Sequence, residues 1–374
     1  MKLKGVRVID LSLFLPGPYL TQMMADHGAE VIKVEPPGGE PVRNVGYRTE
    51  DGVAVWFRNT HRNKKSVVLD LKNDEDREAL LSLADTADVF VEAFRPGVVR
   101  RLGVDPQAVR ARNPRIVYAS IAAFGQTGPE VKRPAHDLAI QALAGTLSLN
   151  LGSDGAPTNP GMPVADLTGS LVALAGILMA LYRREATGRG DYVDISMMDS
   201  LLSWLPNVTG PVFAEDRAPV VKHERSFGGY AFFATYRTKD DRYVALGGVE
   251  PKFVVNFLTA LDRPDLIGIA NGPNGPAQDP VKAFLRQAFA RRTRAEWEEF
   301  ILDLDVCAAP VLDIHEAFHS AQAEARNMLV KDAGGHLHIG LPIKFTDEPG
   351  CLVPDLPELG EHTHEVLAEL RSRG

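Results

Sequence analysis

Residues 5–36 read GVRVIDLSLFLPGPYLTQMMADHGAEVIKVEP and decide the fold that we expect. The run VRVIDL predicts a strand, LPGP a tight turn, YLTQMMADHG a helix and AEVIKVE a second strand. This switch from an apolar run to helical spacing and back is typical of a parallel βαβ unit. The turn lacks GxGxxG and so predicts no nicotinamide or flavin site, although the helix after Pro16 can still accept a phosphate at its N-terminus.

The same alternation continues to residue 125. We expect strands at SVVLDLK, DVFVEAF and RIVYASIAAFG, separated by helices at DEDREALLSLADTA and DPQAVRARN. Phe94 and Arg95 then fall near the carboxyl end of a strand, where open α/β sheets bind their ligands. The expected fold class is therefore α/β, with a Rossmann-like parallel sheet in a large domain.

Residues 36–63 are rich in Pro, Gly and Asn and predict a surface connection of the kind that often carries function. The segment holds several basic residues, and two lysines follow it. For each one taken singly, the simpler interpretation is a solvated surface side chain. These residues are Arg43, Arg48, Arg58, Arg62, Lys64 and Lys65.

Residues 133–168 are the candidate active centre. They open with the pair His136-Asp137 and end where Asp166 precedes LTGSLVALAGILMALYRRE, whose leucine spacing predicts a buried helix. A helix N-terminus would keep the Asp166 carboxylate ionised and would attract a developing oxyanion. The simpler interpretation is that Asp166 and Asp137 only cap helices and that His136 is a hydrogen-bonded core or loop histidine.

The chain changes character after Trp204. A loop-like stretch leads to FGGYAFFATYRTKDDRYVALGGVEPKF, which predicts an antiparallel hairpin followed by a helix. Glu250 stands just before Pro251 at the start of that helix, where an acid is usually a cap. We expect a large domain at 1–205, to which 330–374 returns, a smaller α+β domain at 226–305, and linkers at 206–225 and 306–329.

Composition narrows the classes of partner. The 374 residues carry a net charge of −8 and no basic stripe, which argues against nucleic acid. Two cysteines, Cys307 and Cys351, are too few for a disulfide framework, and we expect buried thiols in a reducing compartment. The start MKLKGVRVIDLS has no signal-peptide core. The longest apolar run, after Ser170, has about thirteen residues, fewer than the ~20 residues that a membrane span needs. We therefore expect a cytoplasmic protein without a membrane partner.

Several stretches between Gly5 and about Phe253 together resemble family III coenzyme A-transferases, the superfamily that also contains α-methylacyl-CoA racemase. They include PGPYLTQMMADHGAEVIKVEPPGGEPVR, EAFRPGVVRRLG, FGQTGP, HDLAIQALAGTLS and GRGDYVDISMMD. The resemblance implies a Rossmann-like large domain, a smaller domain and an interlocked homodimer. It also implies an acyl-CoA substrate, with no bound cofactor and no metal. By position it implies five CoA contacts, namely Arg43, Lys72, Phe94, Arg95 and Arg101, and scattered cations suit the phosphates of CoA.

The resemblance also implies the catalytic residues. In the transferases the aspartate that matches Asp166 is a nucleophile. In the racemases it is an acid/base opposite a histidine that matches His136, which a glutamate matching Glu250 supports. His at 136, the short loop FGGY, the segment GGVEPKF and Leu15 resemble the racemase branch, whereas VADLTG keeps a transferase-like Leu-Thr-Gly.

Our leading hypothesis is a 1,1-proton transfer at C2 of a 2-methyl-branched acyl-CoA, with His136 and Asp166 as the two proton carriers. The backbone N–H groups of Leu167 and Thr168 would stabilise the enolate oxygen, and Asp137 would orient Asp166. The first alternative is a CoA-transferase that forms an Asp166 acyl-enzyme. The second is a non-catalytic CoA-binding or interaction protein in which the acids are only caps.

Overall fold

A computed structural model describes residues 1–152 and 154–373. The chain forms two compact units. Unit 1 holds Met1–Asn150, Thr158–Trp204 and the chain from Ser320 onward, and unit 2 holds Leu151–Pro157 and Leu205–His319. Of the stretches expected as linkers, 206–225 and 306–319 are grouped with unit 2, and 320–329 with unit 1.

Unit 1 is built on a six-stranded sheet in the order β3-β2-β1-β4-β5-β6, and every pair of neighbours is parallel. The strands are β1 (Arg7–Asp10), β2 (Glu30–Glu35), β3 (Lys65–Val68), β4 (Val89–Glu92), β5 (Val117–Ala122) and β6 (Tyr192–Ser196). This order confirms the predicted α/β fold class, and it places the point where the winding reverses between β1 and β4.

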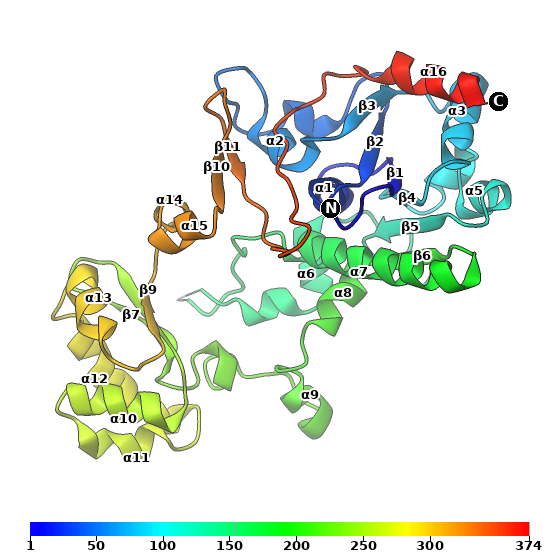
Figure 1. Ribbon diagram of the computed structural model, residues 1–374. Coiled ribbons are helices and arrows are strands. Elements are labelled where there is room, and N and C mark those ends of the chain that lie inside the picture. The colour runs from blue at the N-terminus through cyan, green and yellow to red at the C-terminus, as the bar shows by residue number, and fades with distance from the viewer. Residues whose placement is uncertain (153, 374) are drawn as a thin grey trace. The chain divides into compact units, whose positions relative to one another are not determined.

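Helices cover both faces of this sheet (Figure 1). Alternate strand residues enter different cores, so Val8 and Val31 face one set of helices while Ile9 and Ile32 face the other. The first set is α1 (Pro16–Asp26), α6 (Asp137–Leu143), α7 (Val164–Thr187) and α8 (Met197–Ser203). The second is α3 (Asp74–Ala84), α4 (Val98–Arg101), α5 (Pro106–Arg112) and α16 (Thr363–Arg373).

The longest helix in unit 1, α7, has 24 residues and ends at Gly188, whose φ of 68° suits a glycine at the C-cap. Within the described residues it is the one helix that is long and apolar enough to cross a membrane, and 39% of its most apolar window is buried in the protein. Core helices pass the same test of length and composition, so one such helix is weak support for a membrane span.

The segment 36–63 differs from the surface connection that we expected. It contains a 3₁₀ turn, η1 (Pro41–Asn44), and a helix, α2 (Val55–His61). The side chains of Arg58, Arg62 and Lys64 are buried, so the prediction of solvated surface side chains is wrong for these three. Each has a carboxylate partner, namely Asp51 for Arg58 at 2.5 Å, Asp26 for Arg62 at 2.7 Å and Asp10 for Lys64 at 3.2 Å.

The C-terminal part of the chain runs along the edge of the sheet. After α15 (Ala321–Ala325) come a hairpin of β10 (Leu329–Lys331) and β11 (Leu337–Ile339), and then α16. The backbone N–H of Val68 in the edge strand β3 donates to Thr363 Oγ1 at 3.0 Å, and Ser66 O accepts from the N–H of His362 at 2.9 Å. Val366 of α16 belongs to one of the two cores of the sheet.

Unit 2 has its own sheet and core. The antiparallel strands β7 (Phe233–Arg237), β8 (Tyr243–Gly247) and β9 (Ala308–Pro310) pair in that order. Helices α10 (Pro251–Ala260), α12 (Asp279–Phe289) and α13 (Arg294–Leu302) bring Phe257, Phe289 and Trp297 into the same core. Shorter helices are α9 (Gly210–Glu215), α11 (Ile267–Ala270) and α14 (Ile314–Phe318).

The two cysteines are exposed free thiols, which corrects the expectation that they are buried. Cys307 lies just before β9, a strand at the edge of its sheet, and Cys351 lies in the irregular segment before α16.

Candidate active site

The site is built where the turn between β1 and α1 meets the first turn of α7. Gly17, the second residue of α1, lies so close to Ser12 that a β-carbon at position 17 would overlap the Ser12 side chain. The single hydroxyl hydrogen of Ser170 is shared between two carbonyl acceptors, Pro16 O at 2.7 Å and Asp166 O at 2.8 Å, the latter one helical turn earlier in α7. The hydroxyl of Ser170 therefore links the Pro-Gly-Pro turn to the turn of α7 that carries Asp166.

Asp137 holds the start of α7 rather than the start of its own helix. Its Oδ1 accepts hydrogen bonds from the backbone N–H of Ala165 at 2.7 Å and of Asp166 at 3.2 Å. Its Oδ2 accepts from Gln141 Nε2 at 2.6 Å. A carboxylate that satisfies the free N–H groups of a helix N-terminus stabilises the helix, and here the cap comes from a residue 28 positions away.

Asp166 is the third residue of α7, and its side chain caps nothing. No hydrogen bond to its carboxylate occurs within residues 1–152 and 154–373. Burial, and then the nearby charge of Asp137, raise the pKa of Asp166 from 3.8 to about 7. The Asp166 carboxyl therefore changes between its protonated and ionised forms near neutral pH, whereas the sequence predicted a carboxylate that the helix N-terminus keeps ionised.

The N–H group of Leu167, one of the two predicted oxyanion donors, is not free in this arrangement. The N–H of Leu167 donates to Pro163 O at 3.1 Å, and the two preceding N–H groups donate to Asp137. The start of α7 is thus already satisfied from within the protein. An enolate oxygen would need other donors than the Leu167 N–H that the sequence suggested.

His136 lies directly before α6, at its N-cap, and makes no cap hydrogen bond with its side chain. The imidazole is exposed and meets the ring of Phe14 edge to face, with ring centroids 6.1 Å apart. Unit 1 therefore brings together His136, Asp137 and Asp166 at the starts of α6 and α7. Glu250 lies in unit 2 at the N-cap of α10, and its side chain likewise makes no cap hydrogen bond.

The five expected CoA contacts all belong to unit 1. Phe94 and Arg95 lie two and three residues after the end of β4, at the carboxyl edge of the sheet next to the reversal of winding. The side chains of Lys72, Arg95 and Arg101 are exposed. Arg43 differs from them, because its guanidinium binds both carboxylate oxygens of Glu35, with N···O distances of 2.8 and 2.6 Å, and stacks over the ring of Phe57.

A buried charge cluster lies under the β1–α1 turn, and sequence reasoning missed it. Lys33 Nζ lies 3.7 Å from Asp10 Oδ1 and 3.1 Å from Glu40 Oε2, and all three side chains are at most 1% exposed. Lys64 Nζ also contacts Asp10 at 3.2 Å, and these lysines hold the pKa of Asp10 below its ordinary value although burial opposes them. The one signal in the sequence is that ionisable residues, Asp10 and Lys33, stand inside apolar strands.

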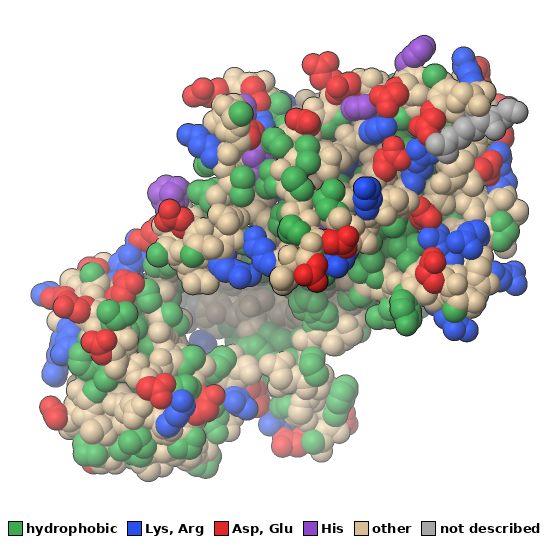
Figure 2. Space-filling view, in the orientation of Figure 1, with side chains coloured by type: hydrophobic (Ala, Val, Ile, Leu, Met, Phe, Trp, Pro, Cys, Tyr) green, Lys and Arg blue, Asp and Glu red, His purple; other side chains and the backbone are tan. Residues whose placement is uncertain are grey.

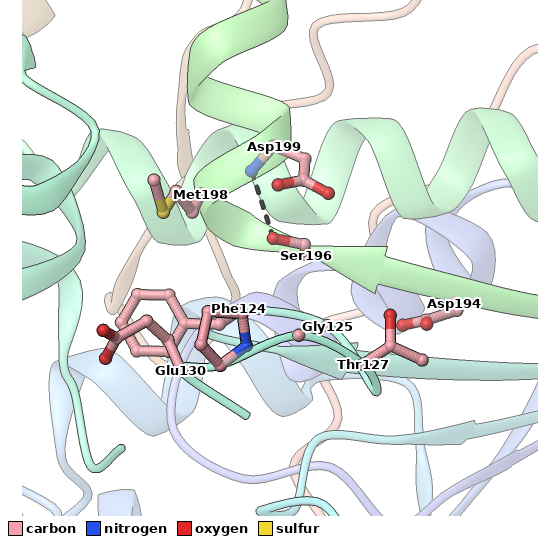
Figure 3. A pocket seen from close by; sticks show the side chains of 10 residues that line it. Phe124, Gly125, Thr127, Glu130, Asp194, Ser196, Met198 and Asp199 are labelled. Atoms are coloured by element: carbon pink, nitrogen blue, oxygen red, sulfur yellow. Dashed lines mark hydrogen bonds between the residues drawn. The ribbon is translucent and has the colours of Figure 1, made fainter. Parts of the chain in front are cut away.

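A pocket of about 320 Å³ opens at the carboxyl ends of β5 and β6 (Figure 3). It is lined by the segment FGQTGP after β5 and by the end of β6 with the start of α8, where Ser196 Oγ accepts a hydrogen bond from the N–H of Asp199 at 3.1 Å. Both carboxylate oxygens of Asp194 accept from the N–H of Gln126 at 3.2 Å. No predicted site residue lines this pocket.

The surface carries both signs of charge. On the face drawn in Figure 2, Lys and Arg side chains are interspersed with Asp and Glu. Among the described residues, no group of three or more His, Cys, Asp or Glu side chains is arranged to hold a metal ion. Proton transfer and covalent catalysis by side chains are the chemistry that the arrangement of His136, Asp137 and Asp166 offers.

Comparison with known proteins identifies the family. The model of CoA-transferase family III matches residues 3–363. An acetyl-CoA:oxalate CoA-transferase from Acetobacter aceti is 36% identical over 97% of this chain and 95% of its own. An alpha-methylacyl-CoA racemase from Mus musculus is 33% identical over 99% of this chain and 93% of its own. The crystal structure of a CaiB/BaiF family protein from Brucella suis superposes with a TM-score of 0.84 at 29% identity, covering 98% of this chain and 99% of that one. This chain belongs to CoA-transferase family III.

Proposed function

We propose that this protein is an enzyme that epimerises C2 of 2-methyl-branched acyl-CoA thioesters by 1,1-proton transfer. The observation that carries the proposal is the state of Asp166, a carboxyl group that caps nothing and has a pKa of about 7. A group with a pKa near the working pH can both accept and return a proton. His136 stands next to Asp137, the residue that contacts the backbone of Asp166, and supplies the second proton carrier.

Each of the two proton carriers acts on one face of the substrate. One removes the α-proton of one epimer and the other returns a proton to the opposite face of the planar enolate. Asp137 raises the pKa of Asp166 through its charge and fixes the first turn of α7 through its hydrogen bonds. Glu250 from the smaller unit of a second copy would hold the tautomer of His136 in a homodimer, in the way the family resemblance implies.

The CoA part of the substrate is proposed to bind along the carboxyl edge of the sheet. Lys72, Arg95 and Arg101 have exposed cationic groups that suit the diphosphate and the 3′-phosphate, and Phe94 lies beside Arg95. Arg43 would contact CoA while its guanidinium remains paired with Glu35. We propose the cytoplasm as the compartment, and no cofactor beyond the CoA of the substrate.

A second candidate function is transfer of CoA between carboxylic acids through an Asp166 acyl-enzyme. Two observations favour it. The relative with 36% identity is named as a CoA-transferase, and the Asp166 carboxylate has no hydrogen bond within the described residues to restrain its attack on a thioester. In that reaction Asp166 would act in its ionised form, and His136 would have no chemical role.

The decisive experiment uses one epimer of a 2-methylacyl-CoA in deuterated water without an acceptor acid. C2 is followed by NMR and mass spectrometry. Epimerisation with incorporation of deuterium at C2 is expected, and His136→Ala should abolish epimerisation while Asp166 still exchanges the proton of one epimer. His364→Ala removes another exposed histidine of unit 1 and serves as the matched control.

The transferase alternative makes opposite predictions. CoA would pass to an added carboxylate with no deuterium at C2, and hydroxylamine would trap Asp166 as its hydroxamate during turnover. Transfer that tolerates His136→Ala, together with an unlabelled C2 for several branched thioesters, would replace the racemase proposal by the transferase.

A further inference from the structure

Phe14 has an unusual backbone for its residue type. Its φ of 63° lies in the left-handed region, which disfavours residues with a β-carbon and is an outlier for bulky ones. The other described non-glycine residues with positive φ are Asn, Asp or Lys. Burial does not explain the conformation, because the Phe14 side chain is 38% exposed. A strained residue persists only where its surroundings hold it, and such residues gather at functional sites.

The buried charge cluster holds this conformation in place. Glu40 Oε1 accepts a hydrogen bond of 2.9 Å from the backbone N–H of Phe14, and Glu40 Oε2 pairs with Lys33 at 3.1 Å. Lys33 Nζ also donates to Ser12 O, two residues before Phe14. Hydrogen bonds with ionised partners are the stronger ones, especially where water is excluded. The Lys33–Glu40 pair therefore holds the turn at Ser12 and at the backbone N–H of Phe14.

The fixed turn directs the Phe14 ring at His136. The two rings meet edge to face, with an interplanar angle of 86°. Within residues 1–152 and 154–373, no hydrogen bond to the His136 ring competes with this contact for the orientation of the imidazole. The same turn reaches α7 through the hydrogen bond from Ser170 to Pro16 O, so it touches both helices that carry the proposed proton carriers.

We infer that Phe14 is a positioning residue, whose ring sets the orientation of the His136 imidazole for proton transfer and whose strained backbone is held by the buried Lys33–Glu40 pair. This inference rests on the proposed function for its kinetic consequence. Its structural consequence is independent of the reaction, because the ring contact exists in the free enzyme. Glycine at position 14 would fit the backbone better than phenylalanine and yet remove the ring.

The test compares Phe14→Gly with Phe14→Tyr in the deuterium-exchange assay. We expect Phe14→Gly to keep or raise the unfolding midpoint, to lower kcat for epimerisation roughly 10- to 100-fold and to change KM little, since misplacing a catalytic group costs rate rather than CoA affinity. Phe14→Tyr, which keeps the ring, should restore kcat. Asp262→Gly relieves another left-handed residue, with φ of 56°, and should leave kcat unchanged.

NMR of protein with labelled histidine supplies a readout that needs no turnover. The wild-type His136 ring should show nuclear Overhauser contacts to the Phe14 ring, and Phe14→Gly should shift and broaden the His136 resonances because the imidazole then samples several rotamers. Full kcat in Phe14→Gly, or unchanged His136 resonances in that variant, would overturn the inference. If the wild-type protein exchanges no deuterium at C2, the proposed racemase reaction fails, and the NMR comparison alone decides the role of Phe14.

Discussion

Replacing Asp166 by Asn should stabilise the protein at alkaline pH, although it removes a proposed proton carrier. The folded protein holds the pKa of Asp166 at about 7, against 3.8 for an ordinary aspartate. The folded state therefore binds this proton more tightly than the unfolded chain does. Its stabilising contribution is complete below pH 3.8 and is lost progressively as the pH rises to about 7.

The size of the effect follows from the shift. A difference of roughly three pKa units at 1.36 kcal/mol each means that ionised Asp166 costs at most about 4 kcal/mol of folding free energy at pH 8. An asparagine carries no charge and avoids this cost. The free energy of unfolding of Asp166→Asn should exceed that of the wild type by an amount near zero at pH 4, rising by about 1.4 kcal/mol per pH unit until pH 7.

Urea denaturation at fixed protein concentration, repeated from pH 4 to pH 8.5, measures this difference. Asp303→Asn, at an exposed aspartate of unit 2, is the control and should show no such rise. A stability gain that is the same at pH 5 and pH 8 would show that Asp166 is ionised throughout. The acid/base role proposed for it would then lose its physical basis.

Further changes separate the roles of neighbouring groups. Asp137→Asn keeps an oxygen that can accept hydrogen bonds from the start of α7 but removes a negative charge. The limb of the pH–rate profile that reports Asp166 should therefore move to lower pH by up to about one unit. A limb that stays in place would refute the effect of the Asp137 charge. Lys33→Met leaves buried carboxylates without their partner and should cost about 3–5 kcal/mol in urea denaturation at pH 7, whereas a loss below about 1 kcal/mol would mean that the cluster relaxes. Arg95→Ala should raise KM for the acyl-CoA about tenfold without changing the stability of the protein. Arg43→Ala should chiefly lower the unfolding midpoint, because the guanidinium of Arg43 is paired with Glu35. The reverse result would make Arg43 the CoA contact and Arg95 the structural residue.

The sheet could be predicted from the sequence because the signals for it are local. The apolar runs around Val8, Val31 and Val89 alternate with helical spacing, and βαβ units of this kind can only join into a parallel sheet. A helix after Asp166 was also predicted, but the leucine spacing indicated the wrong buried face. Leu171 and Leu178 are exposed in unit 1, whereas Ala173 and Ile177 are buried.

The electrostatics of the site could not be predicted, because they depend on pairs that lie far apart in the sequence. Asp137 looks like a cap for the helix that it precedes, yet its side chain caps a helix 28 residues away. Lys64 looks like a surface cation, yet it is buried against Asp10, 54 residues earlier. A charge in a sequence shows that a partner is needed and does not show which residue supplies it, so the pKa of Asp166 and the strain at Phe14 emerge only from the folded chain.

The segment that seals the outer edge of the sheet has a consequence for how the chain folds during synthesis. Thr363, which accepts the hydrogen bond from Val68, leaves the ribosome 295 residues after its partner. At translation speeds of about 5–20 residues per second, β3 waits for roughly 15 to 60 seconds with an unpaired edge and without Val366 over the core beneath it. An open strand edge is a template for pairing with other chains. The nascent protein should therefore depend on chaperones during this interval, until the closing segment arrives.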